Sequence, residues 1–334
     1  MNKYEEYLEA GNKYFEESNF DLALENFEKA LALNPNNAEN LNNIGRCYLN
    51  KNELTEAEKF FNKVIEIDPD YYKAYNNLGL ICKKRFEYDK AIDLYKKSIE
   101  IKPDFWVAYL NIGNIYKEQK EYNLAIEYYI RAVSCNNDQL YLDNTFGLIG
   151  DCYRFLDEFD EAINYYNKAI KLNQELTFAI YGLGIAYYSK QNYKEAIYYL
   201  LLSLEKNYNN SIKDEIYFSL GIAYYKNSEL NKAAEYLNNC LNINPNYPDK
   251  TIFFILGQIY IFLENYKHSI EFFEKYLHYM KNDEKTLTAL GYAYYFLGNK
   301  DKSFSYFEKA TLMNSNYEEP KKYLKEFFGV DYKH

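Results

Sequence analysis

The sequence predicts an all-α protein, an α-solenoid in which antiparallel helix pairs stack into a right-handed superhelix. Three observations favour this fold. Glycine recurs at intervals of 34 to 37 residues, apolar residues follow the period of amphipathic helices, and helix-ending dipeptides such as Asn34-Pro35 and Asn244-Pro245 fall between the periodic segments. These helices leave no room for strands.

The glycine spacing defines the repeat. The intervals between successive glycines are 34, 34, 34, 37, 34, 37, 36 and 34 residues, and these positions take nine of the 13 glycines in the chain. The residues are Gly11, Gly45, Gly79, Gly113, Gly150, Gly184, Gly221, Gly257 and Gly291. Such self-similarity is the signature of a repeat protein.

Placing these glycines at position 8 of a 34-residue unit brings the other markers into register. The nine units then start at Tyr4, Ala38, Tyr72, Trp106, Asp143, Thr177, Asp214, Lys250 and Glu284. Position 20 holds only Ala or Ser, and position 24 holds only Phe, Tyr or Leu. Because two helices can cross closely only where side chains are small, we expect position 8 to meet position 20.

The repeat resembles the tetratricopeptide family, whose pattern combines Leu-Gly, Tyr, Ala, an aromatic residue and Pro. The third unit carries Leu78, Gly79, Ala91, Tyr95 and Pro103 at the family positions. The resemblance covers residues 4–317, which implies one domain of nine repeats that binds proteins.

The ends and the longer intervals are also interpretable. Residues 318–328 predict one more helix that caps the exposed end of the solenoid, and residues 329–334 predict a tail. The insertions that lengthen three intervals fall near Leu140–Leu142, Ser211–Lys213 and Pro248–Asp249, between repeats.

Composition argues against several classes of function. The net charge of -10 and the pI near 5.1 leave no general basic field, so neither nucleic acid nor a membrane is an expected partner. Five scattered cysteines without Cys-x-x-Cys spacing indicate no disulfide framework and no metal site. The acidic amino terminus and the lack of a long apolar run predict a cytoplasmic protein, which we expect to be a monomer.

No catalytic constellation is visible. The only histidines, His268, His278 and His334, lack metal-ligand spacing and are expected on the surface. We therefore predict a protein without enzymatic activity or cofactor.

The resemblance implies a concave groove lined by the first helix of each repeat, mainly through positions 2, 5, 6, 9, 12 and 13. One zone of these columns is rich in amides and cations, and its candidate peptide-binding residues are Asn12, Asn43, Arg46, Lys73, Asn77, Lys83, Asn111 and Asn114. Asn43, Asn77 and Asn111 share position 6, an array similar to the asparagine ladder with which the repeats of O-GlcNAc transferase hold peptide backbone. The alternative is that these amides only satisfy neighbouring backbone groups.

The same zone partly matches the two-carboxylate clamp of some family members. Asn12, Asn43 and Lys73 stand at three of its five positions, but Leu8 and Asn77 replace two cations. We do not expect that specificity.

A second zone is aromatic. Its candidate binding residues are Phe178, Tyr181, Tyr188, Phe218, Tyr225, Phe254, Tyr292 and Tyr295. Exposed apolar surface of this size marks binding sites, although rings can also pack between adjacent helices.

The sequence thus predicts a scaffold or adaptor that holds an extended peptide with acidic character or a free carboxyl terminus. One alternative is a non-catalytic targeting subunit of an enzyme complex, such as one with a separately encoded glycosyltransferase. A third is an RNA-binding superhelix, which requires a basic stripe through the later repeats, and here that stripe stops near Arg154.

Overall fold

The computed structural model describes residues 2–136, 141–206 and 212–332, and over these ranges it contains helices and no strand. The all-α prediction is confirmed. The helices are α1 Lys3–Glu16, α2 Phe20–Leu33, α3 Ala38–Asn50, α4 Leu54–Ile67, α5 Tyr72–Lys84, α6 Tyr88–Ile101, α7 Trp106–Glu118, α8 Tyr122–Cys135, α9 Leu142–Phe155, α10 Phe159–Leu172, α11 Thr177–Ser189, α12 Tyr193–Lys206, α13 Lys213–Lys226, α14 Leu230–Ile243, α15 Thr251–Phe262, α16 Tyr266–Tyr279, α17 Glu284–Phe296, α18 Lys300–Met313 and α19 Glu318–Phe328.

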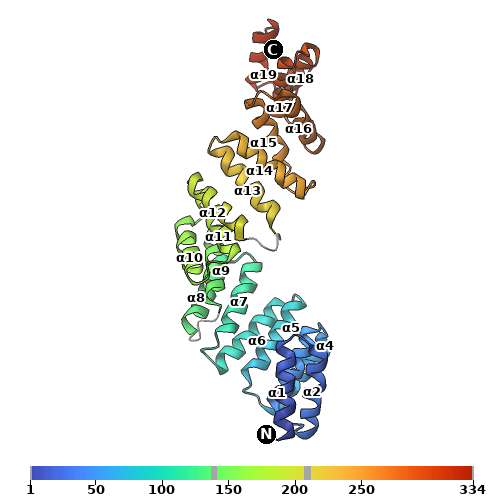
Figure 1. Ribbon diagram of the computed structural model, residues 1–334, viewed down its shortest axis with the longest axis vertical. Coiled ribbons are helices and arrows are strands. Elements are labelled where there is room, and N and C mark those ends of the chain that lie inside the picture. The colour runs from blue at the N-terminus through green and yellow to red at the C-terminus, as the bar shows by residue number, and fades with distance from the viewer. Residues whose placement is uncertain (1, 137–140, 207–211, 333–334) are drawn as a thin grey trace. The chain divides into compact units, whose positions relative to one another are not determined.

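Successive helices form antiparallel pairs, from α1 with α2 to α17 with α18, and α19 follows the last pair (Figure 1). We call the first helix of each pair helix A and the second helix B. The helices group into two compact units, Met1–Gln174 with α1 to α10 and Glu175–His334 with α11 to α19.

Each helix A ends in the same tight turn. In α5, the N–H of Phe86 donates to the carbonyl of Lys83 and the N–H of Glu87 donates to that of Cys82, which is the Schellman pattern. The residue at the corner is left-handed, with φ 61° at Phe86. The equivalent corner residues are Ser18, Asn52, Phe86, Lys120, Asp157, Gln191, Ser228, Glu264 and Gly298.

The repeat glycines lie against the large residue of the paired helix B. A Cβ on Gly113 would lie 2.6 Å from a ring carbon of Tyr129 and 3.3 Å from the carbonyl oxygen of Ala125. The close crossing predicted from the sequence is confirmed. The nearest group, however, is the position 24 side chain in every repeat, and not the small residue at position 20. Where position 20 is serine, its hydroxyl donates to the glycine carbonyl, as Ser303 does to Gly291 at 2.7 Å.

The helix bounds follow the expected register closely. The helices α3, α5, α7, α11 and α17 begin at the residues where repeats were expected to start, and α1, α9, α13 and α15 begin one residue away. Leu142 and Lys213 are the first residues of α9 and α13, and Pro248 and Asp249 lie in the connection before α15. Leu140, Ser211 and His334 are outside the described residues.

Candidate functional site

The predicted amide and cation zone contains a cleft on the face of α1, α3 and α5. Its volume is about 340 Å³. We call it the amide cleft, and its lining is Asn12, Glu39, Asn42, Asn43, Arg46, Tyr71, Lys73, Asn76, Asn77 and Phe105. Five of the eight residues predicted for this zone are in that set. The structure therefore brings together side chains from three successive repeats.

Asparagines of the predicted zone are hydrogen-bonded to one another across repeats, and one of them, Asn111, lines none of the three clefts described on this face. Nδ2 of Asn77 donates to Oδ1 of Asn42 at 2.9 Å, and Nδ2 of Asn111 donates to Oδ1 of Asn76 at 2.9 Å. Each bond joins the sixth residue of one helix A to the fifth residue of the helix A before it. Asn77 is buried and Asn111 is half-buried, so part of the predicted ladder is used to hold repeats together.

These asparagines keep part of their hydrogen-bonding capacity. Each amide has two N–H groups and an oxygen, and the bond to the preceding repeat uses one N–H. In the described part of the chain, no residue donates a hydrogen bond to Oδ1 of Asn77 or to Oδ1 of Asn111. Asn43 differs, because its Oδ1 accepts from Arg46 at 3.4 Å and its Nδ2 lies 3.5 Å from Oδ1 of Asn12.

The cations of the zone are not equally available. Lys83 pairs with Glu118 at 2.7 Å, whereas Lys73 is exposed and has no ion pair with any described residue. The Arg46 guanidinium lies 4.3 Å from the centre of the Phe15 ring and keeps an exposed side chain. Of the three predicted cations, Arg46 and Lys73 are therefore the two without an ion pair to a described residue.

Tyr71 adds a donor to the amide cleft. Burial, and then the nearby Glu39 carboxylate, raise the pKa of Tyr71 to about 12. Its hydroxyl therefore stays protonated at neutral pH and can donate to an anionic group.

Two further clefts continue along the same face of this unit. The first, about 600 Å³, shares Arg46 and Asn77 with the amide cleft and is also lined by Lys83 and Phe86. The second, about 410 Å³, shares Glu118 with the first and is lined by Asn114 and Lys117. The shared lining residues show that the three clefts adjoin one another along α1, α3, α5, α7 and α9, and we call this row of clefts the track.

Several residues of this track were not among the predicted site residues. Glu39 lies at position 2, which is a groove column of the family, so the repeat register could have found it. Phe86 is 78% exposed at the corner of the α5 turn, a position that the groove columns do not include.

A half-buried charge network lies beside the last cleft of the track, which Lys117 lines. Asp151 accepts from Lys117 at 3.0 Å and from the hydroxyl of Tyr166 at 2.7 Å, and Arg154 lies 3.7 Å away. Lys117 and Asp151 belong to successive A helices, α7 and α9. The network therefore links two repeats and neutralises a second cation of the expected basic stripe.

The eight predicted aromatic residues are all half-buried, so they do not form a row of open rings. Tyr181 lies 3.1 Å from the hydroxyl of Ser219, and the Tyr225 hydroxyl donates to Gln258 at 3.2 Å, so these two tyrosines also link successive A helices. Tyr295 stacks on Phe327 with ring centres 3.9 Å apart.

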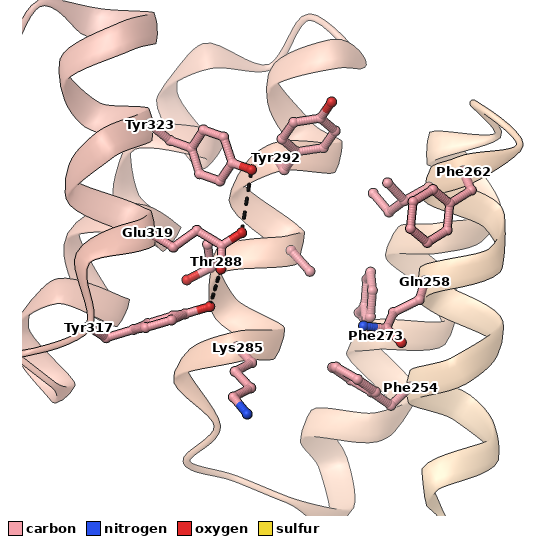
Figure 2. Close-up of a pocket in the computed structure, with 12 residues that line it drawn as sticks. Phe254, Gln258, Phe262, Phe273, Lys285, Thr288, Tyr292, Tyr317, Glu319 and Tyr323 are labelled. Atoms are coloured by element: carbon pink, nitrogen blue, oxygen red, sulfur yellow. Dashed lines mark hydrogen bonds between the residues drawn. The ribbon is translucent and has the colours of Figure 1, made fainter. Parts of the chain in front are cut away.

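The other members of the aromatic zone differ in their surroundings. Tyr188 and Phe218 contact the rings of Tyr193 and Tyr247, with centres 5.8 Å and 4.9 Å apart. Phe178 is half-buried on α11. Only Phe254 and Tyr292 of the eight line the cleft drawn in Figure 2.

That cleft has a volume of about 630 Å³ and lies between α15, α17 and α19 (Figure 2). We call it the aromatic cleft. Its lining is Phe254, Gln258, Ile261, Phe262, Phe273, Lys285, Thr288, Ala289, Tyr292, Tyr317, Glu319 and Tyr323. Part of the predicted aromatic zone thus opens to solvent next to the last helix.

Groups with nucleophilic or metal-binding chemistry offer little in the described chain. Burial raises the pKa of the Cys47, Cys152 and Cys240 thiols to about 12, which keeps them protonated and unreactive. Within residues 2–136, 141–206 and 212–332, no group of three or more His, Cys, Asp or Glu side chains could hold a metal ion. None of the described helices is long and apolar enough to span a membrane. His268 and His278 are exposed, as expected.

The stacked helix pairs, the repeat glycines and the clefts along the A helices define a helical-repeat protein, a class whose members bind other proteins. Six tetratricopeptide-repeat models match the chain, over residues 14–78, 72–105, 107–175, 149–212, 214–247, and 251–278 with 284–317. The chain belongs to the tetratricopeptide-repeat family.

Two solved structures have a similar fold. One is pilF of Pseudomonas aeruginosa, with 20% identity, a TM-score of 0.54, and coverage of 63% of this chain and 92% of that chain. The other is the C-terminal part of a TPR repeat-containing protein from Cytophaga hutchinsonii, with 19% identity, a TM-score of 0.56, and coverage of 71% and 95%. Comparison with curated protein sequences found no match.

Proposed function

We propose that this protein is a non-catalytic scaffold or adaptor that holds an extended, acidic segment of another protein along the amide cleft. Tetratricopeptide repeats are modules that bind proteins and peptides, and family membership supports this class of function. The observation that carries the proposal is the row of adjoining clefts along α1, α3, α5, α7 and α9, in which the first two share Arg46 and Asn77 and the last two share Glu118.

The shape of the track suits an extended chain. A peptide backbone presents alternating N–H and C=O groups, and buried groups of this kind need partners. Asn77 and Asn111 each have an oxygen and one N–H that are not used in the bonds between repeats. We infer that Asn43 and Asn77 hold the backbone within the amide cleft and that Asn111, on the next helix A, extends this array beyond the cleft.

The charge of the partner follows from the cations. Arg46 and Lys73 face the amide cleft, and Tyr71 can donate from its protonated hydroxyl. Hydrogen bonds to charged groups are worth about 1.5–3 kcal/mol, roughly twice those between neutral groups. A carboxylate, from an acidic side chain or a carboxyl terminus, is therefore the group that these residues bind best.

The alternatives from the sequence remain distinguishable. An RNA-binding track requires cations that can meet phosphates, and Lys83 and Lys117 are paired with Glu118 and Asp151. This observation favours protein over RNA. A targeting subunit of an enzyme complex would use the same clefts, and the genes beside this one would reveal the enzyme.

Selection of random short peptides displayed on phage, with the full chain as bait, tests the proposal. We expect the selected sequences to be enriched in Asp and Glu and to compete with one another for one site. Nuclease treatment of the bait should change nothing. Selection of basic sequences, or binding that nuclease removes, would contradict the proposed function.

A further inference from the structure

The aromatic cleft lies on the same helix-A columns as the amide cleft but has different chemistry. The second, fifth, sixth and ninth residues of α3, which are Glu39, Asn42, Asn43 and Arg46, line the amide cleft. The same positions of α17 are Lys285, Thr288, Ala289 and Tyr292, and all four line the aromatic cleft. One framework thus presents amides in the first unit and apolar groups in the second.

The polar groups of the aromatic cleft are mostly satisfied within the protein. The Glu319 carboxylate accepts from the hydroxyls of Tyr317 and Tyr323, as the dashed lines in Figure 2 show. The Thr288 hydroxyl donates to the carbonyl of Glu284 at 2.7 Å, and Gln258 accepts from Tyr225 at 3.2 Å. The Glu319 and Thr288 groups therefore need no ligand, and the Gln258 oxygen already has a donor.

Two exposed side chains of this cleft, Lys285 and Phe262, are available to a ligand. The Lys285 side chain is exposed and makes no ion pair or hydrogen bond with any described residue, and it stands across the cleft from Phe254 in Figure 2. Phe262 is 65% exposed at the end of α15 and faces the cleft from that side. A cation without an ion pair, in a cleft that also presents an exposed ring, favours a ligand that combines a carboxylate with apolar surface.

We propose that the aromatic cleft is a second peptide site, which takes a large apolar side chain of a partner segment together with an adjacent carboxylate. The apolar side chain packs between Phe254, Phe262 and Tyr292, and the carboxylate pairs with Lys285. The last helix, α19, contributes Glu319 and Tyr323 to the lining and so forms a wall of this site as well as covering the end of the repeats.

Three matched peptides separate the contribution of the apolar side chain from that of the carboxylate. Each is a short, fluorescent Gly-Ser peptide with Asp-Phe, Asp-Ala or Asn-Phe at its centre. We expect the full chain to bind the Asp-Phe peptide most tightly. Loss of either the ring or the charge should weaken binding by about fivefold, as expected for one ring contact or one exposed ion pair.

Variants of exposed residues assign the site without unfolding the protein. Lys285→Gln and Phe262→Ser should each weaken binding of the Asp-Phe peptide by about fivefold. The matched controls Lys281→Gln and Leu312→Ser change an exposed lysine and an exposed leucine elsewhere in the second unit and should have no effect.

The proposal is overturned if the three peptides bind equally, if the Asp-Phe peptide does not bind at millimolar concentration, or if both cleft variants bind like the unmodified chain. The amide-cleft variant Asn77→Ala should leave this binding unchanged. Failure at the aromatic cleft is therefore distinct from failure of the proposed function in the first unit.

Discussion

The side-chain amide of Asn77 donates a 2.9 Å hydrogen bond to Oδ1 of Asn42, which lies on the preceding helix A. The same relationship between positions 5 and 6 of successive repeats joins Asn76 to Asn111, and it recurs in the second unit between Tyr181 and Ser219. Groove columns of this repeat therefore serve two purposes, because one side chain both links repeats and lines the surface. Binding and stability must be measured together on any variant of these columns.

Replacement of Asn77 by Ala is expected to destabilise the protein by about 1–3 kcal/mol, because the buried Oδ1 of Asn42 loses its donor. Urea denaturation followed by circular dichroism measures this change. Asn62→Ala is the control, because Asn62 is exposed on α4 and has no such bond. Equal stability of the two variants would mean that the Asn77 bond contributes nothing.

Replacement of Gly113 by Leu should cost several kcal/mol, since even a Cβ at this position would lie 2.6 Å from the ring of Tyr129. Gly113→Ala should cost less, about 1–3 kcal/mol, because the ring can shift to admit one methyl group. Thermal denaturation tests both. An unchanged melting temperature for the leucine variant would contradict the packing described for helices A and B.

Replacement of Phe86 by Gly is expected to stabilise the fold by up to about 1 kcal/mol, because a left-handed residue with a Cβ is strained and the exposed ring buries little surface. Gly298→Ala, at the equivalent corner with φ 87°, should destabilise by a similar amount. Urea denaturation checks both variants, whose midpoints should shift in opposite directions. Phe86 also lines the track, so a variant that is more stable yet binds peptide less well would show that the ring is retained for binding.

Replacement of Arg46 or Lys73 by Gln should weaken binding of an acidic peptide by up to about fivefold at low salt and should reduce the salt dependence of that binding. Lys83→Gln should have a smaller effect, since Glu118 already neutralises Lys83. Titrations at low and high salt compare the three variants. If Lys83 proved as important as Lys73, the ion pair with Glu118 would have to open on binding.

Removal of residues 318–334 should promote association of the protein. The truncation exposes Phe307, Tyr292 and Tyr295, whose rings contact Tyr323 or Phe327 of α19. Size-exclusion chromatography with light scattering measures the mass in solution. A truncated chain that stays monomeric and equally soluble would show that α19 is not needed to cover these rings.

Much of the fold could be predicted because the same close packing at a glycine recurs in all nine repeats. Gly113 and its equivalents marked the helix crossings, and the dipeptides with Pro marked the connections. The sequence pattern could not show that the large side chain at position 24, and not the small one at position 20, is what excludes a Cβ at the glycine, because both residues follow the same period.

The candidate site was less predictable. Column positions identified Asn43, Asn77 and Arg46 as neighbours, but they could not distinguish amides that face solvent from amides that bond the adjacent repeat. Nor could they pair Lys83 with Glu118, because the partner depends on the rotation of successive A helices. Phe86 was missed because its exposure arises from the turn and not from a helix face.

Titration calorimetry of one selected acidic peptide tests the central claim, that the amide cleft holds the partner. The variant Asn43→Ala with Asn77→Ala and Asn111→Ala is compared with the control Asn62→Ala with Asn164→Ala and Asn167→Ala, which changes exposed asparagines on α4 and α10. We predict at least about tenfold weaker binding for the cleft variant, the size expected for the loss of one or two hydrogen bonds, and unchanged binding for the control. Normal binding by the folded cleft variant, together with loss of binding when Tyr188, Phe218 and Tyr225 are changed to Ala, would contradict the account and place the partner on the aromatic zone.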